Sequence, residues 1–268
     1  IYLVVLLQMA FQPLLARHHL PVHGQSHALP AQAPLLEQAN QGPSAAHWLG
    51  TDAVGHDVLG RLMYGGKVSL MVGIAAGVLA TVVGTLWGSV AGYVGGWVDA
   101  LMMRVVDAGI AIPALFILLV ISAITNPGVG GLIVILGLVS WLVPSRLIRA
   151  ETLTLKNRDY VLTLRAIGGS HARAIGKHLL PNSVSTIVVA ATFQVADAIL
   201  LVAYVSYLGL GVQPPATDWG GMLSAGLTAA YSGHWWLIVP PGLAVILVVC
   251  AFNAVGDGLR DAFDVRGR

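Results

Sequence analysis

The sequence has 268 residues, of which 56% are hydrophobic and only 10% are charged. An ordinary soluble domain has about a quarter of its residues charged, so this chain is too poor in charge to cover a surface that faces water. The formal net charge of +2 and the lack of a basic stripe with interleaved aromatic residues give no support to nucleic-acid binding. Composition therefore favours a bundle of membrane spans.

Six apolar stretches reach or approach the length of about 20 residues that a helix needs to cross a bilayer. They are Ile1–Ala16, Val68–Tyr93, Leu101–Ile124, Gly131–Leu147, Val184–Leu210 and Trp235–Asn253. We predict an all-α, polytopic membrane protein with six transmembrane helices. The chain opens at Ile1 inside an apolar run, so residues 1–17 are expected to be a first span that lacks part of the native N-terminus. A cleaved signal peptide would need a basic start, which this stretch does not show.

Residues 18–67 are rich in proline, histidine and glutamine and are expected to be extracytoplasmic. They include six of the nine histidines, namely His18, His19, His23, His27, His47 and His56. His19, His23 and His27 would line one face of a helix and could ligate a metal there. Two prolines and a glycine within residues 21–30 oppose that helix, so we favour a solvated loop and predict no metal site.

Glycines recur every four residues in the second predicted span, in the pairs Gly73–Gly77, Gly84–Gly88 and Gly88–Gly92. This spacing places small residues on one helix face, where another helix can approach closely. In the third span, Pro113 removes a backbone donor and crowds the preceding turn, which predicts a kink.

Lysine and arginine are distributed unevenly between the two sides of the predicted spans. One side receives eleven: Arg104, Arg146, Arg149, Lys156, Arg158, Arg165, Arg173, Lys177, Arg260, Arg266 and Arg268. The other side receives three: Arg17, Arg61 and Lys67. Because these residues stay on the cytoplasmic side of short loops, both termini are expected in the cytoplasm. Residues 18–67 and a predicted loop at residues 211–234 then face outward.

The stretch from residue 157 to 170 is too polar to span a membrane, yet it is patterned as a short helix. Val161, Leu164 and Ile167 recur at helical spacing, Asp159 is placed to cap the start, and Gly168 follows the end. We expect a helix on the cytoplasmic surface whose apolar face, ringed by arginines, fits a groove on another protein. A helix lying among lipid headgroups is the alternative interpretation.

Asp197 is the one carboxylate deep inside a predicted span. An acidic residue at the bilayer centre costs about 2.5–3.5 kcal/mol on insertion scales, so it needs either a polar partner or contact with water. We weigh equally a hydrogen bond to a neighbouring helix and a position on a translocation pathway, to which Gln194 would also contribute.

Four runs of sequence carry a resemblance to a known family. They are Gly168 followed nine residues later by His178-Leu179-Leu180-Pro181; Gly50-Thr51-Asp52-Ala53-Val54-Gly55-His56-Asp57-Val58-Leu59-Gly60-Arg61; Ser206-Tyr207-Leu208-Gly209-Leu210-Gly211-Val212-Gln213-Pro214-Pro215; and Gly256-Asp257-Gly258-Leu259-Arg260-Asp261. Together they resemble the permeases of binding-protein-dependent ABC importers, in the branch for dipeptides, oligopeptides and nickel. The similarity extends over about residues 50–266.

The resemblance implies which residues have family roles. Those expected to form the coupling helix that docks into an ATPase subunit are Asp159, Tyr160, Arg165, Ala166, Ile167, Gly168, Gly169, Ser170 and Arg173. Those matching other family motifs are Gly50, Thr51, Asp52, Gly55, Asp57, Arg61, Pro181, Asn182, Gly209, Gly211, Gly256, Asp257, Arg260 and Asp261. The sequence departs from the family where Leu162-Thr163-Leu164 replaces Glu-Ala-Ala and where His178 replaces isoleucine.

The resemblance also implies a type I importer permease in the bacterial plasma membrane, with residues 68–268 as a core of five spans. Expected partners are a homologous permease subunit, two ATP-binding subunits or domains, an extracytoplasmic solute-binding protein and membrane lipid. The chain itself is expected to be neither an enzyme nor a cofactor-binding protein. Its nearest approach to a phosphate loop, at residues 60–67, lacks the Ser or Thr after the lysine and follows no predicted strand. ATP and magnesium would bind to the partners.

Peptides are the first expectation for the cargo. Nickel, haem or another metal chelate is the alternative, with the outer histidines as its only support in the sequence. An ion-coupled secondary transporter is the alternative of a different class, but such proteins usually show internal repeats and several deep ionisable groups. A purely structural membrane scaffold would not need the patterned basic stretch.

Overall fold

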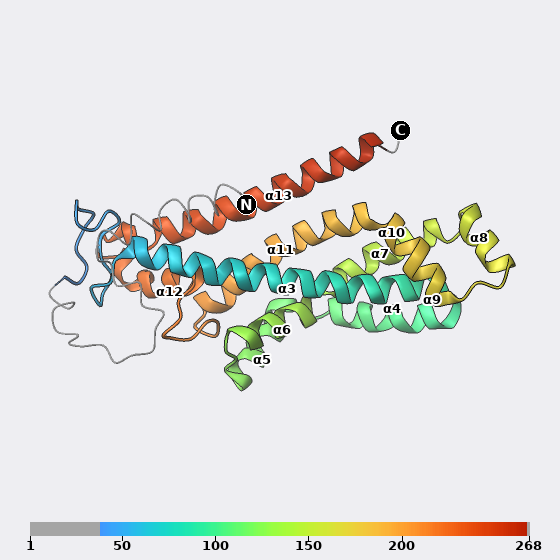
Figure 1. Cartoon of the computed structure of the whole chain (residues 1–268). Helices are drawn as coiled ribbons and strands as arrows, with labels where there is room; N and C mark the ends of the chain where they lie inside the picture. The colour runs from blue at the N-terminus through green and yellow to red at the C-terminus, as the bar shows by residue number, and fades with distance from the viewer. Residues whose placement is uncertain (1–37, 267–268) are drawn as a thin grey trace. The chain divides into compact units, whose positions relative to one another are not determined.

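The computed structural model describes residues 38–266, and this range is helical with no β-strand (Figure 1). The elements are α3 (Val58–Val94), α4 (Gly96–Ile110), α5 (Ala114–Thr125), α6 (Val129–Ser140), α7 (Leu142–Leu155), α8 (Asp159–Ala166), α9 (His171–Arg173), the π-helix η1 (Ala174–Leu179), α10 (Leu180–Asn182), α11 (Val184–Tyr207), α12 (Trp219–Ala230), the 3₁₀ helix η2 (Trp235–Leu237) and α13 (Val239–Arg266). The predicted first span, Ile1–Ala16, lies outside the described residues.

Three helices between residues 38 and 266 are long and apolar enough to cross a membrane: Val58–Val94, Val184–Tyr207 and Trp235–Phe263. Two helix pairs pass the same test together, but each pair is bent, by 76° between α4 and α5 and by 45° between α6 and α7. The described chain therefore has three helices that are long and apolar enough to span a membrane, or up to five if each bent pair is one span.

The bends lie at prolines. The break that Pro113 predicts is present, and Pro113 is the residue that precedes α5. Pro144 stands in the first turn of α7, where it cannot donate to the carbonyl of Ser140 at the end of α6. The predicted spans Leu101–Ile124 and Gly131–Leu147 are thus each a pair of shorter helices.

Two elements near the other spans differ from what the sequence predicts. The helix that contains the predicted span Val68–Tyr93 is longer than that span: α3 begins at Val58, where Asp57 accepts a hydrogen bond from Gly60 N–H at 2.8 Å and caps the first turn. The predicted loop at residues 211–234 contains the helix α12, whose N-cap Asp218 accepts hydrogen bonds from the N–H groups of Gly220 and Gly221.

The described chain divides into two compact units, with the divisions inside α3, α11 and α13. Unit 1 comprises residues 38–71 and 202–248, and unit 2 comprises residues 72–201 and 249–266. Each unit is described by itself below.

In unit 2, the glycines of α3 allow two other helices to approach its backbone. A Cβ added at Gly77 would lie 2.8 Å from the Cα of Val195 on α11, and one at Gly84 would lie 2.7 Å from the Trp141 carbonyl oxygen. Further along, a Cβ at Gly92 would lie 2.9 Å from the Arg149 carbonyl oxygen on α7. The glycine-lined contact face that the four-residue spacing predicts is confirmed.

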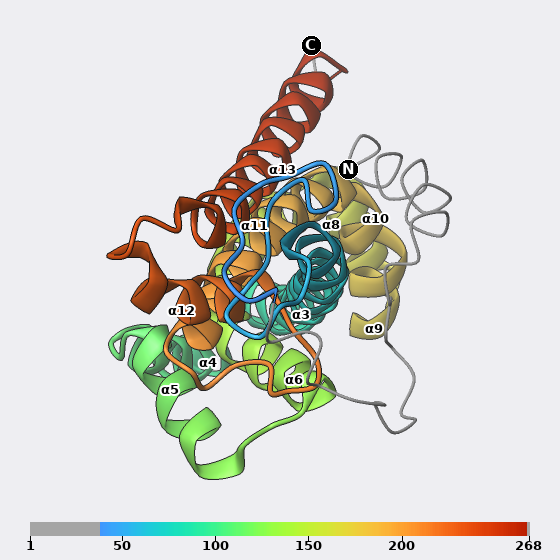
Figure 2. The ribbon, with the colours of Figure 1, turned by 90° about the vertical axis from the view of Figure 1, so that its left-hand side faces the viewer.

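Ion pairs join α4 to α7 in the same unit. Arg149 donates to both carboxylate oxygens of Asp99, at 2.5 and 2.6 Å, and Arg146 pairs with Asp107 at 2.5 Å. The shorter helices α5 and α6 lie side by side (Figure 2). Away from the glycines, α3 exposes an apolar stripe that fits lipid or a second membrane subunit, formed by Ile74, Val78, Val82, Leu86 and Val90.

We predict that Gly88→Ala destabilises unit 2. The new Cβ would overlap the Ser145 carbonyl oxygen and lie 2.9 Å from Arg149 N, and both are backbone atoms of α7. Overpacking of this kind costs about 1–3 kcal/mol. The midpoint of thermal unfolding in detergent should fall, whereas the control Gly130→Ala should not lower it, because nothing lies within 4 Å of a Cβ there. Equal midpoints for the two variants would contradict the close helix contact.

Candidate functional site

The stretch predicted to form a surface helix does so, as α8 (Asp159–Ala166) (Figure 1). Its start differs from the prediction that Asp159 caps it. The N-cap is Arg158, in extended backbone and without a side-chain cap hydrogen bond, and Asp159 is the first helical residue. In that position its carboxylate still interacts favourably with the positive end of the helix dipole.

The end of α8 is fixed by Gly168, as predicted. Gly168 has φ +78°, a left-handed conformation that residues with a side chain rarely adopt. Its N–H donates to the Arg165 carbonyl at 3.1 Å, while Gly169 N–H donates to the Leu164 carbonyl at 2.8 Å. These two hydrogen bonds form a Schellman motif, which turns the chain sharply into Ser170 and α9. The Ser170 hydroxyl then accepts from Arg173 N–H at 3.3 Å and caps that short helix.

The apolar residues of α8 divide between two faces. Val161 and Leu164 are buried in a cluster with Tyr93 of α3 and with Ala174 and Leu179 of η1. The prediction that the apolar face is free for a partner is therefore wrong for Val161 and Leu164, which this chain covers itself.

The outward side of α8 retains exposed apolar groups. Ile167 is 77% exposed and Leu162 46%, with Tyr160 beside them at 39%. The other expected coupling residues that are exposed are Asp159, Arg165, Ala166, Gly168, Ser170 and Arg173, with Gly169 half-buried. The outward side of α8 and the turn after it thus present apolar groups surrounded by arginine cations.

The chain returns to the long helices through a π-helix. Pro181 of α10 has no N–H to donate to the turn before it, and that turn is wound as η1. The side-chain amide of Asn182 donates to the His178 carbonyl at 2.6 Å, and His178 lies beside Tyr160 with ring centroids 6.3 Å apart. The first contact joins α10 to η1, and the second joins η1 to α8.

Asp197 lies on α11 in unit 2, and it is exposed while both of its neighbours, Ala196 and Ala198, are buried. No hydrogen bond or ion pair connects its carboxylate to another residue in the range 38–266. The hydrogen bond to a neighbouring helix that the sequence left open is thus absent from this range. Gln194, three residues earlier, is buried.

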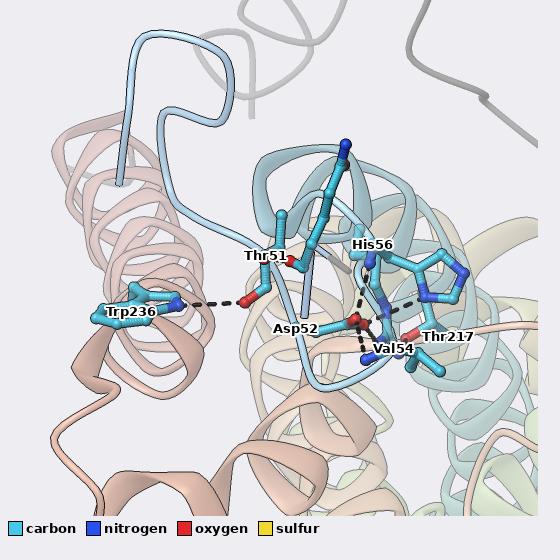
Figure 3. Close-up of polar contacts among 8 residues, drawn as sticks. Thr51, Asp52, Val54, His56, Thr217 and Trp236 are labelled. Atoms are coloured by element: carbon cyan, nitrogen blue, oxygen red, sulfur yellow. Dashed lines mark hydrogen bonds and ion pairs between the residues drawn. The ribbon is translucent and has the colours of Figure 1, made fainter. Parts of the chain in front are cut away.

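In unit 1, the motif from Gly50 to Arg61 forms a compact polar network around Asp52 (Figure 3). One oxygen of Asp52 accepts from the N–H groups of Val54 and His56, at 2.9 and 2.8 Å. The other pairs with Arg61, which also donates to the Thr217 hydroxyl at 3.1 Å. Burial would raise the pKa of Asp52, but the hydrogen bonds and the Arg61 charge outweigh it, so that the pKa lies below its usual value.

The remaining residues of this motif fix the turn around the network. Gly50 and Gly55 adopt φ +71° and +85°. The Thr51 carbonyl accepts from the indole N–H of Trp236 at 3.3 Å (Figure 3), which attaches the segment to η2. Asp57 both caps α3 and pairs with His47 at 2.8 Å.

A cavity of about 60 Å³ lies beside the network and is lined mainly by apolar side chains such as Met222 and Leu237. A space of this size holds a few water molecules.

The outer histidines fall into two groups, those outside and those inside the described residues. His18, His19, His23 and His27 lie outside the described residues. His47 and His56 pair with the carboxylates of Asp57 and Asp52. Across residues 38–266 there is no group of three or more side chains that could hold a metal ion.

The loop after α11 begins with the same Schellman motif that ends α8. Gly209, at φ +81°, donates to the Ser206 carbonyl at 3.0 Å, and Leu210 N–H donates to the Val205 carbonyl at 3.0 Å. A side chain at Gly211 would overlap Ser206. Both glycines are therefore required by the backbone path.

The last motif lies on α13 in unit 2. A Cβ at Gly256 would lie 3.0 Å from the ring of Phe193 on α11, so this glycine permits close packing. Asp257, Arg260 and Asp261 are exposed.

Three residues of these sites escaped the sequence prediction: Tyr93, Thr217 and Asp218. Asp218 is fully buried, and the order Asp218-Trp219-Gly220 could have been read as a helix N-cap. Burial raises the pKa of Asp218 more than its hydrogen bonds lower it. Tyr93 and Thr217 act through contacts distant in sequence, for which no local signal exists.

Comparison with known proteins supports the resemblance. The profile of the family described as binding-protein-dependent transport system inner membrane component matches residues 84–268. A putative peptide permease protein of Brucella suis is 46% identical over 232 residues, which cover 86% of this chain and 77% of the relative. Dipeptide transport system permease proteins of Escherichia coli and Bacillus subtilis are 50% and 40% identical, over 84% and 87% of this chain and 74% and 73% of their own lengths.

We predict that Arg61→Ala loosens the segment around Asp52. It leaves a buried carboxylate without its cation, although the backbone N–H groups remain, and the expected loss is about 2 kcal/mol. Because Trp236 contacts this segment, the transition should be visible in tryptophan fluorescence on heating. Arg61→Lys, which keeps the charge, should lose less. Unchanged unfolding of Arg61→Ala would show that the ion pair contributes nothing.

Proposed function

The chain belongs to the family of binding-protein-dependent transport system inner membrane components, and on this premise we propose that it is the permease subunit of an ATP-driven importer of dipeptides and oligopeptides. The names of the relatives, which are dipeptide and peptide permeases, support peptides as the cargo. The observation that carries the proposal is α8, a short helix held in place by its own chain while Ile167, Leu162 and Tyr160 remain exposed.

The exposed side of α8 has the features of a docking surface. Apolar groups ringed by arginines suit a groove on a soluble partner, which in an ATP-driven importer is the ATP-binding subunit. ATP and magnesium bind there, and this chain makes and breaks no bond. Closure of two ATP-binding subunits would displace α8, and the long helices would tilt between inward-open and outward-open states.

The proposed arrangement in the bacterial plasma membrane follows from the distribution of lysine and arginine. Six spans, counting residues 1–17, place both termini and α8 in the cytoplasm. The Asp52 network and the rest of residues 18–67 then face outward, where a solute-binding protein delivers the cargo. The permease core is residues 68–268.

The translocation pathway is proposed to lie between this chain and a homologous permease subunit, with Asp197 beside it. A charged carboxylate on a spanning helix is too costly to leave facing lipid, and Asp197 has no polar partner among residues 38–266. Contact with water, or with the second permease, resolves this. A carboxylate there would also attract the ammonium group of a passing peptide.

We predict that Ile167→Glu disrupts docking of the ATP-binding subunit. The side chain is 77% exposed, so the permease should fold normally, yet the charge would enter an apolar contact. Copurification with the ATP-binding subunit and peptide uptake should both fall about tenfold or more. The matched control is Asn157→Glu, which adds the same charge at an exposed residue before α8. Wild-type copurification and uptake by Ile167→Glu would refute the docking surface.

We predict that Asp197→Asn slows peptide uptake several-fold, by about 1 kcal/mol of lost attraction, and leaves ATP hydrolysis intact. The substitution keeps the size of the side chain and removes its charge, whereas Asp197→Glu keeps the charge and should retain more uptake. Uptake is measured in proteoliposomes loaded with ATP. If Asp197→Asn transports at the wild-type rate, the carboxylate does not act on the cargo.

A further inference from the structure

We infer that Tyr93 is the positioning residue that makes α3 follow the movement of α8. This inference rests on the proposed function, in which α8 is displaced by the ATP-binding subunits. Tyr93 is the penultimate residue of α3 and is only 3% exposed. The elements that follow α7, namely α8, α9 and η1, enclose its ring, and we call these three elements the α8 module.

All three elements of that module meet at the Tyr93 ring. Val161 and Leu164 of α8 and Ala174 and Leu179 of η1 share its buried cluster. The imidazole of His171, the first residue of α9, and the Tyr93 ring form a T-shaped pair with centroids 5.5 Å apart. Because the rigid Tyr93 ring is closely packed, movement of these elements relative to α3 would create either a cavity or a steric clash at the ring.

Arg165 adds a charged contact from the exposed side. Its guanidinium lies over the Tyr93 ring, 5.7 Å from the centroid, which is a cation–π geometry. Arg165 is one of the arginines that ring the proposed docking surface. The same side chain therefore borders the partner and contacts α3.

The backbone around Tyr93 is held to α7 as well. Gly92 packs against Thr152, with the position of an added Cβ 2.9 Å from the Thr152 Cβ, and its carbonyl accepts from Lys156 Nζ at 2.9 Å. The covalent chain already links α8 to α7 and, through η1 and α10, to α11. Tyr93 supplies the link to α3, which chain connectivity does not.

The ring rather than the hydroxyl makes this link. The Tyr93 oxygen is buried and has no hydrogen-bond partner in the described chain. An unsatisfied buried hydroxyl contributes nothing favourable to packing, so phenylalanine should serve as well as tyrosine. This separates positioning by shape from any role of the phenol.

The test compares Tyr93→Ala, Tyr93→Phe and Leu136→Ala in the complete importer, reconstituted with its ATP-binding subunits and peptide-loaded binding protein. The readout is peptide taken up per ATP hydrolysed. Tyr93→Ala should lower this ratio about fivefold while hydrolysis continues, and Tyr93→Phe should keep it at the wild-type value. Leu136→Ala, which opens a cavity at a fully buried residue of α6 outside the cluster, should also keep it.

Three results would overturn the inference: an unchanged ratio in Tyr93→Ala, a defect in Tyr93→Phe equal to that of Tyr93→Ala, or the same fall in Leu136→Ala. If Tyr93→Ala does not accumulate in membranes, Tyr93→Leu takes its place and must lower the ratio at least twofold. Failure of the wild type to couple uptake to ATP would instead refute the proposed function, so the two failures are distinguishable.

Discussion

The close approach of α3 to α7 and α11 is the constraint on which unit 2 depends. Lipid tails are as apolar as leucine, so burial gives membrane helices little reason to associate, and contact between their surfaces has to supply the attraction. The glycines of α3 permit that contact by leaving no side chain between backbones, as at Gly84 and Gly92. Near the end of the same helix, Tyr93 packs against Val161 and Leu164 of α8. Movement of one helix in such an array is transmitted to its neighbours, because tight packing leaves no slack.

Unit 1 is stabilised differently, because its irregular backbone is held by hydrogen bonds and ion pairs to individual carboxylates. Asp52 accepts from two backbone N–H groups and from Arg61, and Asp57 stabilises the start of α3. Asp218 does the same for α12. In the part that the structure describes, residues 38–67, the segment predicted to be a histidine-rich loop is therefore an ordered structure. Its carboxylates serve as helix caps and ion-pair partners.

Local signals were sufficient to predict the apolar stretches that form α3, α11 and α13, the break at Pro113, the glycine face of α3, and α8 with its end at Gly168. Each of these depends on hydropathy, on proline geometry or on a left-handed glycine, all of which are properties of neighbouring residues. Local signals did not show that the predicted span Gly131–Leu147 is also a bent pair of helices. The failures have the opposite character. α12 was mistaken for a loop because its small residues give weak hydrophobic periodicity, and the burial of Val161 and Leu164 depends on Tyr93, far away in sequence. Arg61 could be assigned to a motif, but its contact with Thr217 could not be foreseen.

The account requires α8 to face the cytoplasm and to touch an ATP-binding subunit there. Cysteine cross-linking tests this directly in membranes that contain the whole importer, with Cys250, the single cysteine of this sequence, replaced by serine. Ile167→Cys is expected to cross-link to the ATP-binding subunit and to resist a membrane-impermeant thiol reagent added from outside, while Ala53→Cys, beside the Asp52 network, is expected to react with that reagent. Labelling of residue 167 from outside, or its failure to cross-link in an importer that transports normally, would contradict the account.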